Sequence, residues 1–363
     1  MINFPTSKTP LKTIGLLFEL QADLLIGENA TEATHYHWRE PAEVEAVAES
    51  LTNLGYHVDL IGSVDQLLER WREKNLPELV WNLSVRVLSR SRTAIAPAIL
   101  EQLKIPYTGA DAACKSLVLN KGWLKPLLDW IGISTPPWSC YPPGEAIAAL
   151  PPWEISILKP ACEGYSLGLT RFESKRGLSA LQETVTALQQ QFNSVILCEP
   201  LIVGREITVG VVGNPDSSDF PRLIGGVETL TLDEQPLQEQ ILDLKAKRQG
   251  GFKKVVVDLT TPELTPLQTV ALKLMERLAP LDYATFDFRL TPEGKAYLLD
   301  VNADATLHPQ RSFAQIATQN GLSYRELIGE ILQTVIQRWE LSVNSKPKKR
   351  REEVSQPVLR LDE

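Results

Sequence analysis

The chain has 363 residues, of which 43% are hydrophobic and 23% charged, and a formal net charge of −8 at pH 7. This composition is typical of a globular protein of two or three domains, and the negative balance argues against a dedicated nucleic-acid binder, whose binding face would be basic. No apolar run has the roughly 18 to 20 residues of a membrane span, no secretory signal is visible, and the four cysteines have no CxxC spacing, so we expect a cytoplasmic protein without a zinc knuckle or disulfide framework.

The first third of the chain alternates two kinds of pattern. Strand-like runs and segments with apolar residues at helical spacing follow each other at residues 13–19, 41–54, 57–61, 65–74 and 78–84. This βαβαβ order predicts the start of a parallel sheet. The sequence IPYTGAD at 105–111 predicts a further strand and turn, and residues 121–132 predict a helix.

The rest of the chain reads as two further units. The proline-rich stretch 136–152 predicts a connection with an alanine-rich helix between two Pro-Pro pairs. Residues 155–213 follow the order strand, loop, strand, helix, strand, strand, and residues 223–337 again combine strands with helices. The last residues mix charges without apolar periodicity, so we expect a disordered tail in which KPKKRR is solvated rather than a targeting or nucleic-acid signal.

The stretch ILKPACEGYSLGLTRF, residues 157–172, brings Lys159 into a loop that contains Gly164 and Gly168. It fits an ordinary hairpin with a solvated lysine. It also fits a phosphate-binding loop, because glycine lets backbone N–H groups approach an anion and the lysine supplies positive charge. The chain has neither a GxxxxGK[ST] nor a GxGxxG motif, so this stretch alone leaves both interpretations open.

An acidic hairpin follows near the C-terminal end, in TFDFRLTPEGKAYLLDVNAD. A Pro-Glu-Gly-Lys turn joins two strand-like segments, so Asp287 on the first can share a face with Asp300 and Asn302 on the second. The alternative is a solvated outer face, but aspartate and asparagine are depleted in strands, and here they lie among Phe, Tyr, Leu and Val. Oxygen ligands grouped in this way suit Mg²⁺.

A third stretch, VILCEPLIVGREITVGVVGN, contains Glu199 at the end of a strand and Glu206 after a Gly204-Arg205 turn. Alone, it predicts a hairpin with surface charges. Beside a lysine-glycine loop and an acidic hairpin, one of these carboxylates can accept hydrogen bonds from ribose hydroxyls. The three stretches together predict a site for a nucleotide and its metal.

These motifs, together with IPYTGAD, Lys121 and TPPW, occur in an order that resembles the ATP-grasp superfamily and, within it, the D-alanine–D-alanine ligase family, over residues 13–337. The resemblance implies an α/β protein with an ATP-grasp fold, in which ATP lies between the central and C-terminal domains. The implied units are an N-terminal parallel-sheet domain at 1–115, a central lid domain at 116–210, a C-terminal metal-binding domain at 211–340 and a disordered tail at 341–363.

The resemblance also implies roles for individual residues. The implied ATP-binding residues are Lys121, Lys159, Glu163, Gly164, Ser166, Gly168, Glu199, Pro200, Leu201, Glu206 and Lys247. Among them Glu206 resembles the ribose ligand, and Lys247 resembles the lysine that reaches the γ-phosphate from a mobile loop. Asp287, Asp300 and Asn302 resemble the ligands of two Mg²⁺ ions.

The sequence departs from the family where the other substrates would bind. After LVWNLS the chain is basic, with Arg86, Arg90 and Arg92 and no acid, and guanidinium groups suit a carboxylate. Thr285 stands where the family has an arginine that stabilises the oxyanion, and His308, Arg311 and Ser312 lie near the expected site of the acceptor's carboxylate. The predicted catalytic residues are Lys247, Arg311 and Ser312.

The implied reaction is phosphorylation of an oxygen on a first substrate by ATP, followed by attack of an amine of a second. Because the substrate half departs from the family, the leading hypothesis is a ligase that joins an amino acid to a mycosporine-glycine-type acceptor. The alternatives are a D-alanine–D-alanine ligase of peptidoglycan synthesis and a nucleotide-binding protein without catalysis. We expect a homodimer whose ligands are ATP, an amino acid and a second small molecule, with no nucleic acid or membrane partner.

Overall fold

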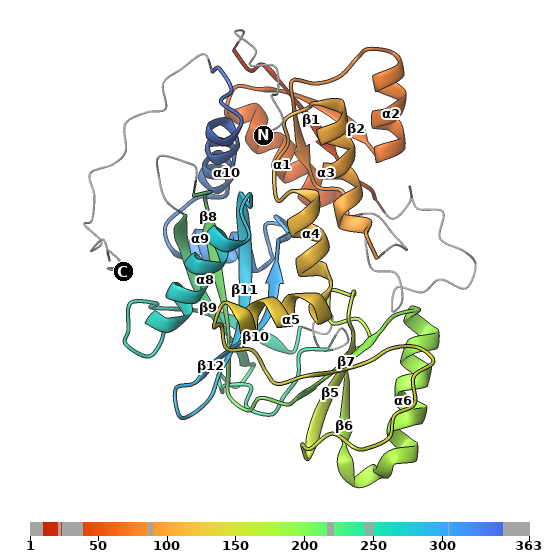
Figure 1. The fold of residues 1–363 in the computed structure, drawn as a ribbon. Helices are drawn as coiled ribbons and strands as arrows, with labels where there is room; N and C mark the ends of the chain where they lie inside the picture. The colour runs from red at the N-terminus through yellow and green to blue at the C-terminus, as the bar shows by residue number, and fades with distance from the viewer. Residues whose placement is uncertain are drawn as a thin grey trace.

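The computed structural model describes residues 10–20, 23, 39–85, 90–215, 221–243, 246, 250–303 and 305–343. In this part of the chain three separate sheets form, with helices packed against them (Figure 1). The predicted α/β class is therefore confirmed.

The N-terminal sheet has the predicted parallel pairing. Its central strand β1 (Thr13–Leu17) lies between β2 (His57–Gly62) and β3 (Leu79–Asn82). The crossover helices α1 (Pro41–Asn53) and α2 (Val64–Arg72) occupy the segments predicted to be helical.

Three helices then connect this sheet to the next: α3 (Arg92–Leu103), α4 (Ala112–Leu119) and α5 (Lys121–Trp130). The strand predicted at 105–111 is wrong, because only Tyr107 makes a single bridge to Val80 there. The chain turns at Gly109, which has φ +92°, and the Asp111 side chain then accepts a hydrogen bond from Cys114 N at 2.7 Å and caps α4.

The central sheet is antiparallel and has the strand order β4-β7-β5-β6. Its strands are β4 (Ser139–Tyr141), β5 (Ile155–Pro160), β6 (Thr170–Glu173) and β7 (Ile196–Pro200), with a short 3₁₀ turn at Ser174–Arg176. Helix α6 (Gly177–Phe192) buries Leu181, Val185 and Leu188 against this sheet.

The alanine-rich helix predicted between the two Pro-Pro pairs does not form, and residues 142–154 are irregular. The stretch between the pairs is too short for a stable helix, and the residue before each proline is biased away from helical backbone.

The third sheet has five antiparallel strands in the order β10-β9-β8-β11-β12. They are β8 (Arg205–Val212), β9 (Arg222–Thr231), β10 (Phe252–Val257), β11 (Tyr283–Leu290) and β12 (Ala296–Asn302). Helix α8 (Thr265–Arg277) shares one core with α4 and α5 against this sheet, and α9 (Ser312–Gln319) packs on strands β8 to β10. The predicted hairpin of Asp287 and Asp300 is formed by β11 and β12.

The hairpin predicted for 196–213 is wrong, because β7 belongs to the central sheet and β8 to the five-stranded sheet. Residues 201–204 instead connect the two sheets. Gly204 has φ +147°, and a Cβ atom there would lie 2.1 Å from Leu290 O, so a larger residue does not fit this crossing. Strand β8 also continues past residue 210, the predicted end of the central domain.

The C-terminal helix α10 (Tyr324–Arg338) packs against α1, so the end of the chain shares a core with the N-terminal sheet (Figure 1). Residues 341–343 continue this packing, and Leu11 N donates to Ser342 O at 2.7 Å. The remainder of the predicted tail lies outside the described residues. Across the described residues, no helix combines the length and apolar character needed to span a membrane.

Candidate active site

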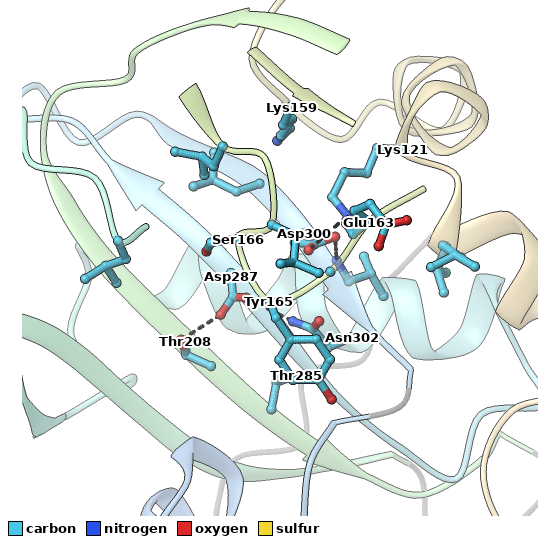
Figure 2. A pocket seen from close by; sticks show the side chains of 18 of the residues that line it. Lys121, Lys159, Glu163, Tyr165, Ser166, Thr208, Thr285, Asp287, Asp300 and Asn302 are labelled. Carbon is cyan, nitrogen blue, oxygen red and sulfur yellow. Dashed lines mark hydrogen bonds and ion pairs between the residues drawn. The ribbon is translucent and has the colours of Figure 1, made fainter. Parts of the chain in front are cut away.

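A cavity of about 360 Å³ lies between the central sheet and the five-stranded sheet, and Figure 2 shows side chains that line it. Helices α3 to α5, the β5–β6 loop, strands β7, β8, β11 and β12 and the segment after β12 all contribute to its wall. The lining includes these residues predicted from the sequence: Arg92, Lys121, Lys159, Glu163, Gly164, Ser166, Glu199, Pro200, Leu201, Glu206, Thr285, Asp287, Asp300, Asn302 and Ser312.

The glycine-bearing loop between β5 and β6 is held by cations from two other elements. Lys121 at the start of α5 donates from Nζ to Glu163 O at 2.9 Å. Arg92 at the start of α3 donates to Cys162 O at 2.7 Å and lies 3.3 Å from Glu163 Oε2. The loop therefore closes one wall of the cavity. Gly168 is not part of this lining, since its α carbon faces Phe192 and Pro160, where a Cβ would lie within 2.8 Å of both.

A buried carboxylate lies between two lysines at the inner end of the cavity. Glu199 Oε2 is 2.5 Å from Lys159 Nζ, and its other oxygen forms an ion pair with Lys125. Burial raises the pKa of the Glu199 carboxyl, but the charges and hydrogen bonds of the two lysines together outweigh it and hold that pKa below its usual range. For Lys125 burial prevails, and its pKa is lowered despite the attraction of Glu199.

The acidic hairpin faces the cavity with two carboxylates and an amide. Asp287 and Asp300 are cross-strand partners, as are Thr285 and Asn302. Asp287 accepts hydrogen bonds from Thr208 Oγ1 at 2.7 Å and from Asn302 Nδ2 at 2.9 Å (Figure 2). Lys121 Nζ lies 3.3 Å from Asp300 Oδ2, so this carboxylate already has a cation beside it.

These groups fit a magnesium site. The described part of the chain has no cluster of three or more His, Cys, Asp or Glu side chains suited to a metal. Mg²⁺ does not need one, because it is usually held by one or two carboxylates together with substrate phosphates and water. The side-chain oxygens of Asp287, Asp300 and Asn302 are hard ligands on one wall of the cavity, which matches that requirement.

Glu206, the predicted ribose ligand, is oriented by Arg289 on the neighbouring strand, whose Nη2 lies 3.0 Å from Glu206 Oε2. The Arg289 guanidinium is buried and also donates to the carbonyl oxygens of Gly204, Gln238 and Gln240 at 2.6 to 3.0 Å. The Glu206 carboxylate is thus fixed in the cavity wall by a side chain that has little freedom of its own.

Three residues predicted for the acceptor or first substrate lie elsewhere. His308 Nε2 and Arg311 Nη2 lie 3.2 and 2.9 Å from the carboxylate of Glu40, next to α1. The Arg90 guanidinium lies 4.7 Å from the centroid of the Trp123 ring, a cation–π contact. None of these three side chains lines the cavity. Arg86 and Lys247 fall outside the described residues.

The structure also adds residues that sequence reasoning missed. Lys115 on α4 is 1% exposed and lines the cavity, and its signal in the sequence was a lysine inside the apolar run AACKSLVL. Glu19, after β1, accepts hydrogen bonds from Ser84 Oγ at 2.9 Å and Val85 N at 3.3 Å. An acid therefore does lie beside the LVWNLS segment, although the segment itself contains none.

Residues 153–333 match a protein-family model described as the D-ala D-ala ligase C-terminus. The chain is also 27% identical over 290 residues to a D-alanine–D-alanine ligase of Aquifex aeolicus, covering 79% of this chain and 92% of that protein. A D-alanine–D-alanine ligase of Maridesulfovibrio salexigens is 27% identical over 308 residues, covering 82% and 95% of the two chains.

Solved structures show the same fold. The D-alanine–D-alanine ligase of Bacillus anthracis complexed with ATP superimposes with a TM-score of 0.67 at 15% identity, covering 91% of this chain and 99% of that one. The corresponding ligase of Coxiella burnetii gives a TM-score of 0.64 at 16% identity, covering 91% and 96%.

The three sheets give the chain the ATP-grasp class of fold, as the resemblance in the sequence indicated. Within that class the chain belongs to the D-alanine–D-alanine ligase-like family, and it is accordingly an ATP-dependent ligase.

Proposed function

We propose that ATP binds in the cavity between the central and five-stranded sheets. Lys121, Lys159 and the 163–168 loop hold the phosphates, the backbone at 199–201 meets the adenine, and Glu206 binds the ribose. Asp287, Asp300 and Asn302 hold two Mg²⁺ ions, which neutralise charge on the transferred phosphoryl group. The observation that carries this proposal is that the lysines, the loop and the acidic hairpin line one cavity.

The reaction we propose has two steps. The γ-phosphoryl group passes from ATP to an oxygen of the first substrate, and ADP leaves. The amine nitrogen of the second substrate then attacks the carbon that bears this oxygen, a C–N bond forms, and phosphate departs with the oxygen. The lysines position the phosphates, and the loop held by Arg92 and Lys121 excludes water from the phosphorylated intermediate.

For the substrates, we propose an amino acid as the amine donor and a mycosporine-glycine-type ring as the group that is phosphorylated. Support comes from the residues that line the cavity, among which Arg92 and Lys115 are buried cations and Thr285 is a short neutral side chain. Buried cations favour a substrate with carboxylate or carbonyl oxygens.

A second candidate is a D-alanine–D-alanine ligase. The curated relatives carry that name, and Glu19 places a carboxylate beside Ser84 and Val85, close to the cavity wall, where the ammonium group of an amino acid would find a counter-charge.

Product analysis by mass spectrometry separates the two candidates. Purified protein is incubated with ATP and Mg²⁺, first with D-alanine alone and then with L-amino acids plus a mycosporine-glycine-type acceptor. We expect phosphate release and a new C–N product only in the second mixture. Efficient formation of D-alanyl-D-alanine would instead establish the second candidate.

A further inference from the structure

The turn at the tip of the β5–β6 loop has an unusual backbone. Leu167 N donates to Gly164 O at 3.0 Å and closes a four-residue turn. Its two central residues, Tyr165 and Ser166, have φ values of +54° and +61°. Turns of this kind favour glycine or asparagine at both positions, because a Cβ atom is strained in the left-handed region.

The neighbouring contacts keep this turn in place. Arg92 holds the carbonyl of Cys162 and Lys121 holds that of Glu163, just before the turn. Leu167, just after it, is 2% exposed. Strained backbone persists only where its surroundings fix it, and it is concentrated at functional sites. A strained turn that its neighbours hold in place therefore points to a function of the side chain that the turn presents.

That side chain is the phenol ring of Tyr165, which lines the cavity. Figure 2 shows the ring on the side of the cavity where Thr285 and Asn302 lie, beyond the carboxylate of Asp287. Lys159, at the opposite side of the same view, belongs to the group proposed to hold phosphates. The ring thus lies on the side of the cavity away from Lys159, and we assign this side to the first substrate of the proposed function.

We infer that Tyr165 forms a wall of the first-substrate subsite and selects a flat, unsaturated ring that bears a carbonyl oxygen. An aromatic face gains energy from offset stacking on a planar group beyond the area it covers, whereas a small saturated amino acid has no such face to offer. The left-handed turn fixes the backbone that carries the ring before the substrate arrives, so binding has to order less of the loop. This inference rests on the proposed function and specifies the substrate class of that site.

The test compares wild-type protein with Tyr165→Phe, Tyr165→Ala and the control Tyr297→Ala. Tyr297 lies on β12 outside the cavity lining, with Lys295 Nζ 4.7 Å from its ring centroid. Calorimetry with a non-hydrolysable ATP analogue measures the Kd of the nucleotide, and then the Kd of a mycosporine-glycine-type ring ketone and of D-alanine. Phosphate release is measured separately with each substrate.

We expect Tyr165→Ala to weaken binding of the ring ketone about 5- to 10-fold and to weaken binding of the nucleotide less, because the loop is proposed to meet the phosphates with backbone groups that this substitution keeps. Tyr165→Phe should keep the affinity for the ring, since it keeps the aromatic face, and Tyr297→Ala should match wild type. An unchanged Kd for the ring in Tyr165→Ala, equal losses for ring and nucleotide, or no binding of the ring to wild type would overturn the inference. Ring binding that depends on Tyr165 but never leads to phosphate release would leave the inference standing and overturn the proposed function.

Discussion

The ammonium group of Lys121 lies 3.3 Å from Asp300 Oδ2, and these two side chains come from the first turn of α5 and from β12. The same ammonium group donates to Glu163 O in the β5–β6 loop. One lysine therefore connects the loop proposed to cover the phosphates with a carboxylate proposed to bind metal. This contact links the two parts of the site that are proposed to bind phosphate and metal.

We expect Asp300→Ala to abolish ATP-dependent phosphate release and leave the fold intact, because the side chain is half-buried at a cavity wall and supplies a hard oxygen ligand. An assay of phosphate release measures the loss of activity, and circular dichroism checks that the fold is intact. Glu293→Ala, in the turn of the same hairpin and exposed, is the matched control and should behave as wild type. Wild-type turnover in Asp300→Ala would contradict the metal assignment.

We expect Lys159→Ala to weaken ATP binding by about 1.5 to 3 kcal/mol, roughly 10- to 150-fold in Kd, through loss of a charge-assisted contact to phosphate. Glu199 keeps Lys125 as a partner in this variant, so the buried carboxylate is not left without a counter-charge. Calorimetric titration with an ATP analogue measures the change. Lys175→Ala, which removes an exposed lysine of the same domain, should leave the Kd unaltered.

The pair of lysines around Glu199 also has a pH signature. The pKa of the Glu199 carboxyl is lower in the folded protein than in the unfolded chain. The contribution of this carboxyl to the free energy of unfolding is therefore present above the ordinary glutamate pKa of about 4.3, and it is lost as pH falls through the lower folded value. Glu199→Gln should reduce that free energy at pH 7 by about 3 to 5 kcal/mol. The difference from wild type should shrink below about pH 4.

Urea unfolding at a series of pH values measures this difference. Glu183→Gln on the exposed face of α6 is the control, since its side chain is exposed and accepts a hydrogen bond from Ser179 Oγ. A gap between wild type and Glu199→Gln that stays constant down to pH 3 would show that the two lysines do not stabilise the carboxylate in the way described.

Much of the lining of the cavity could be predicted from local sequence, because its residues lie in short motifs whose geometry is set locally. Asp300 and Asn302 share a face because a strand has a period of two, and Lys159 ends a strand that leads into a glycine-bearing loop. The predictions failed where the pairing of strands decides the structure, because local sequence does not determine which strands pair. Strands β7 and β8 adjoin in sequence and still join different sheets.

The substrate half could not be predicted in the same way, because its contacts join residues far apart in the chain. His308 and Arg311 were expected to face an acceptor, yet both meet Glu40, about 270 positions earlier. The segment after β3 contains no acid, yet Glu19 from the end of β1 lies against it. The absence of a residue type from one segment says little about the charge of the site built around it.

The segment after β12 is held by a buried carboxylate of α1, which gives a prediction about stability. Glu43 accepts hydrogen bonds from Leu307 N at 2.6 Å and Thr306 Oγ1 at 3.0 Å, and it lies 3.3 Å from Arg39. Glu43→Ala should lower the free energy of unfolding by about 3 to 5 kcal/mol, because it breaks a buried ion pair with Arg39 and removes the acceptor of Leu307 N and Thr306 Oγ1. Urea denaturation measures this, with exposed Glu45→Ala on the same helix as control. A loss below 1 kcal/mol would contradict it.

The last prediction concerns Arg92, a positioning residue that joins α3 to the β5–β6 loop through Cys162 O and Glu163. If this loop shields the phosphorylated intermediate, releasing it admits water, and water then competes with the amine of the second substrate. Arg92→Ala should therefore raise the ratio of phosphate released to ligation product above the wild-type value, with ATP still bound.

Simultaneous assays of phosphate and of ligation product measure this ratio, and calorimetry measures the Kd of the nucleotide. Arg72→Ala, at the exposed end of α2, is the matched control and should keep the wild-type ratio. Arg92→Lys should recover only part of the coupling, because a lysine keeps the charge but lacks the planar fork that contacts a carbonyl and a carboxylate together. A purely structural role for Arg92 would lower phosphate and product equally and leave their ratio unchanged, which is the result that would reject the shielding role of the loop.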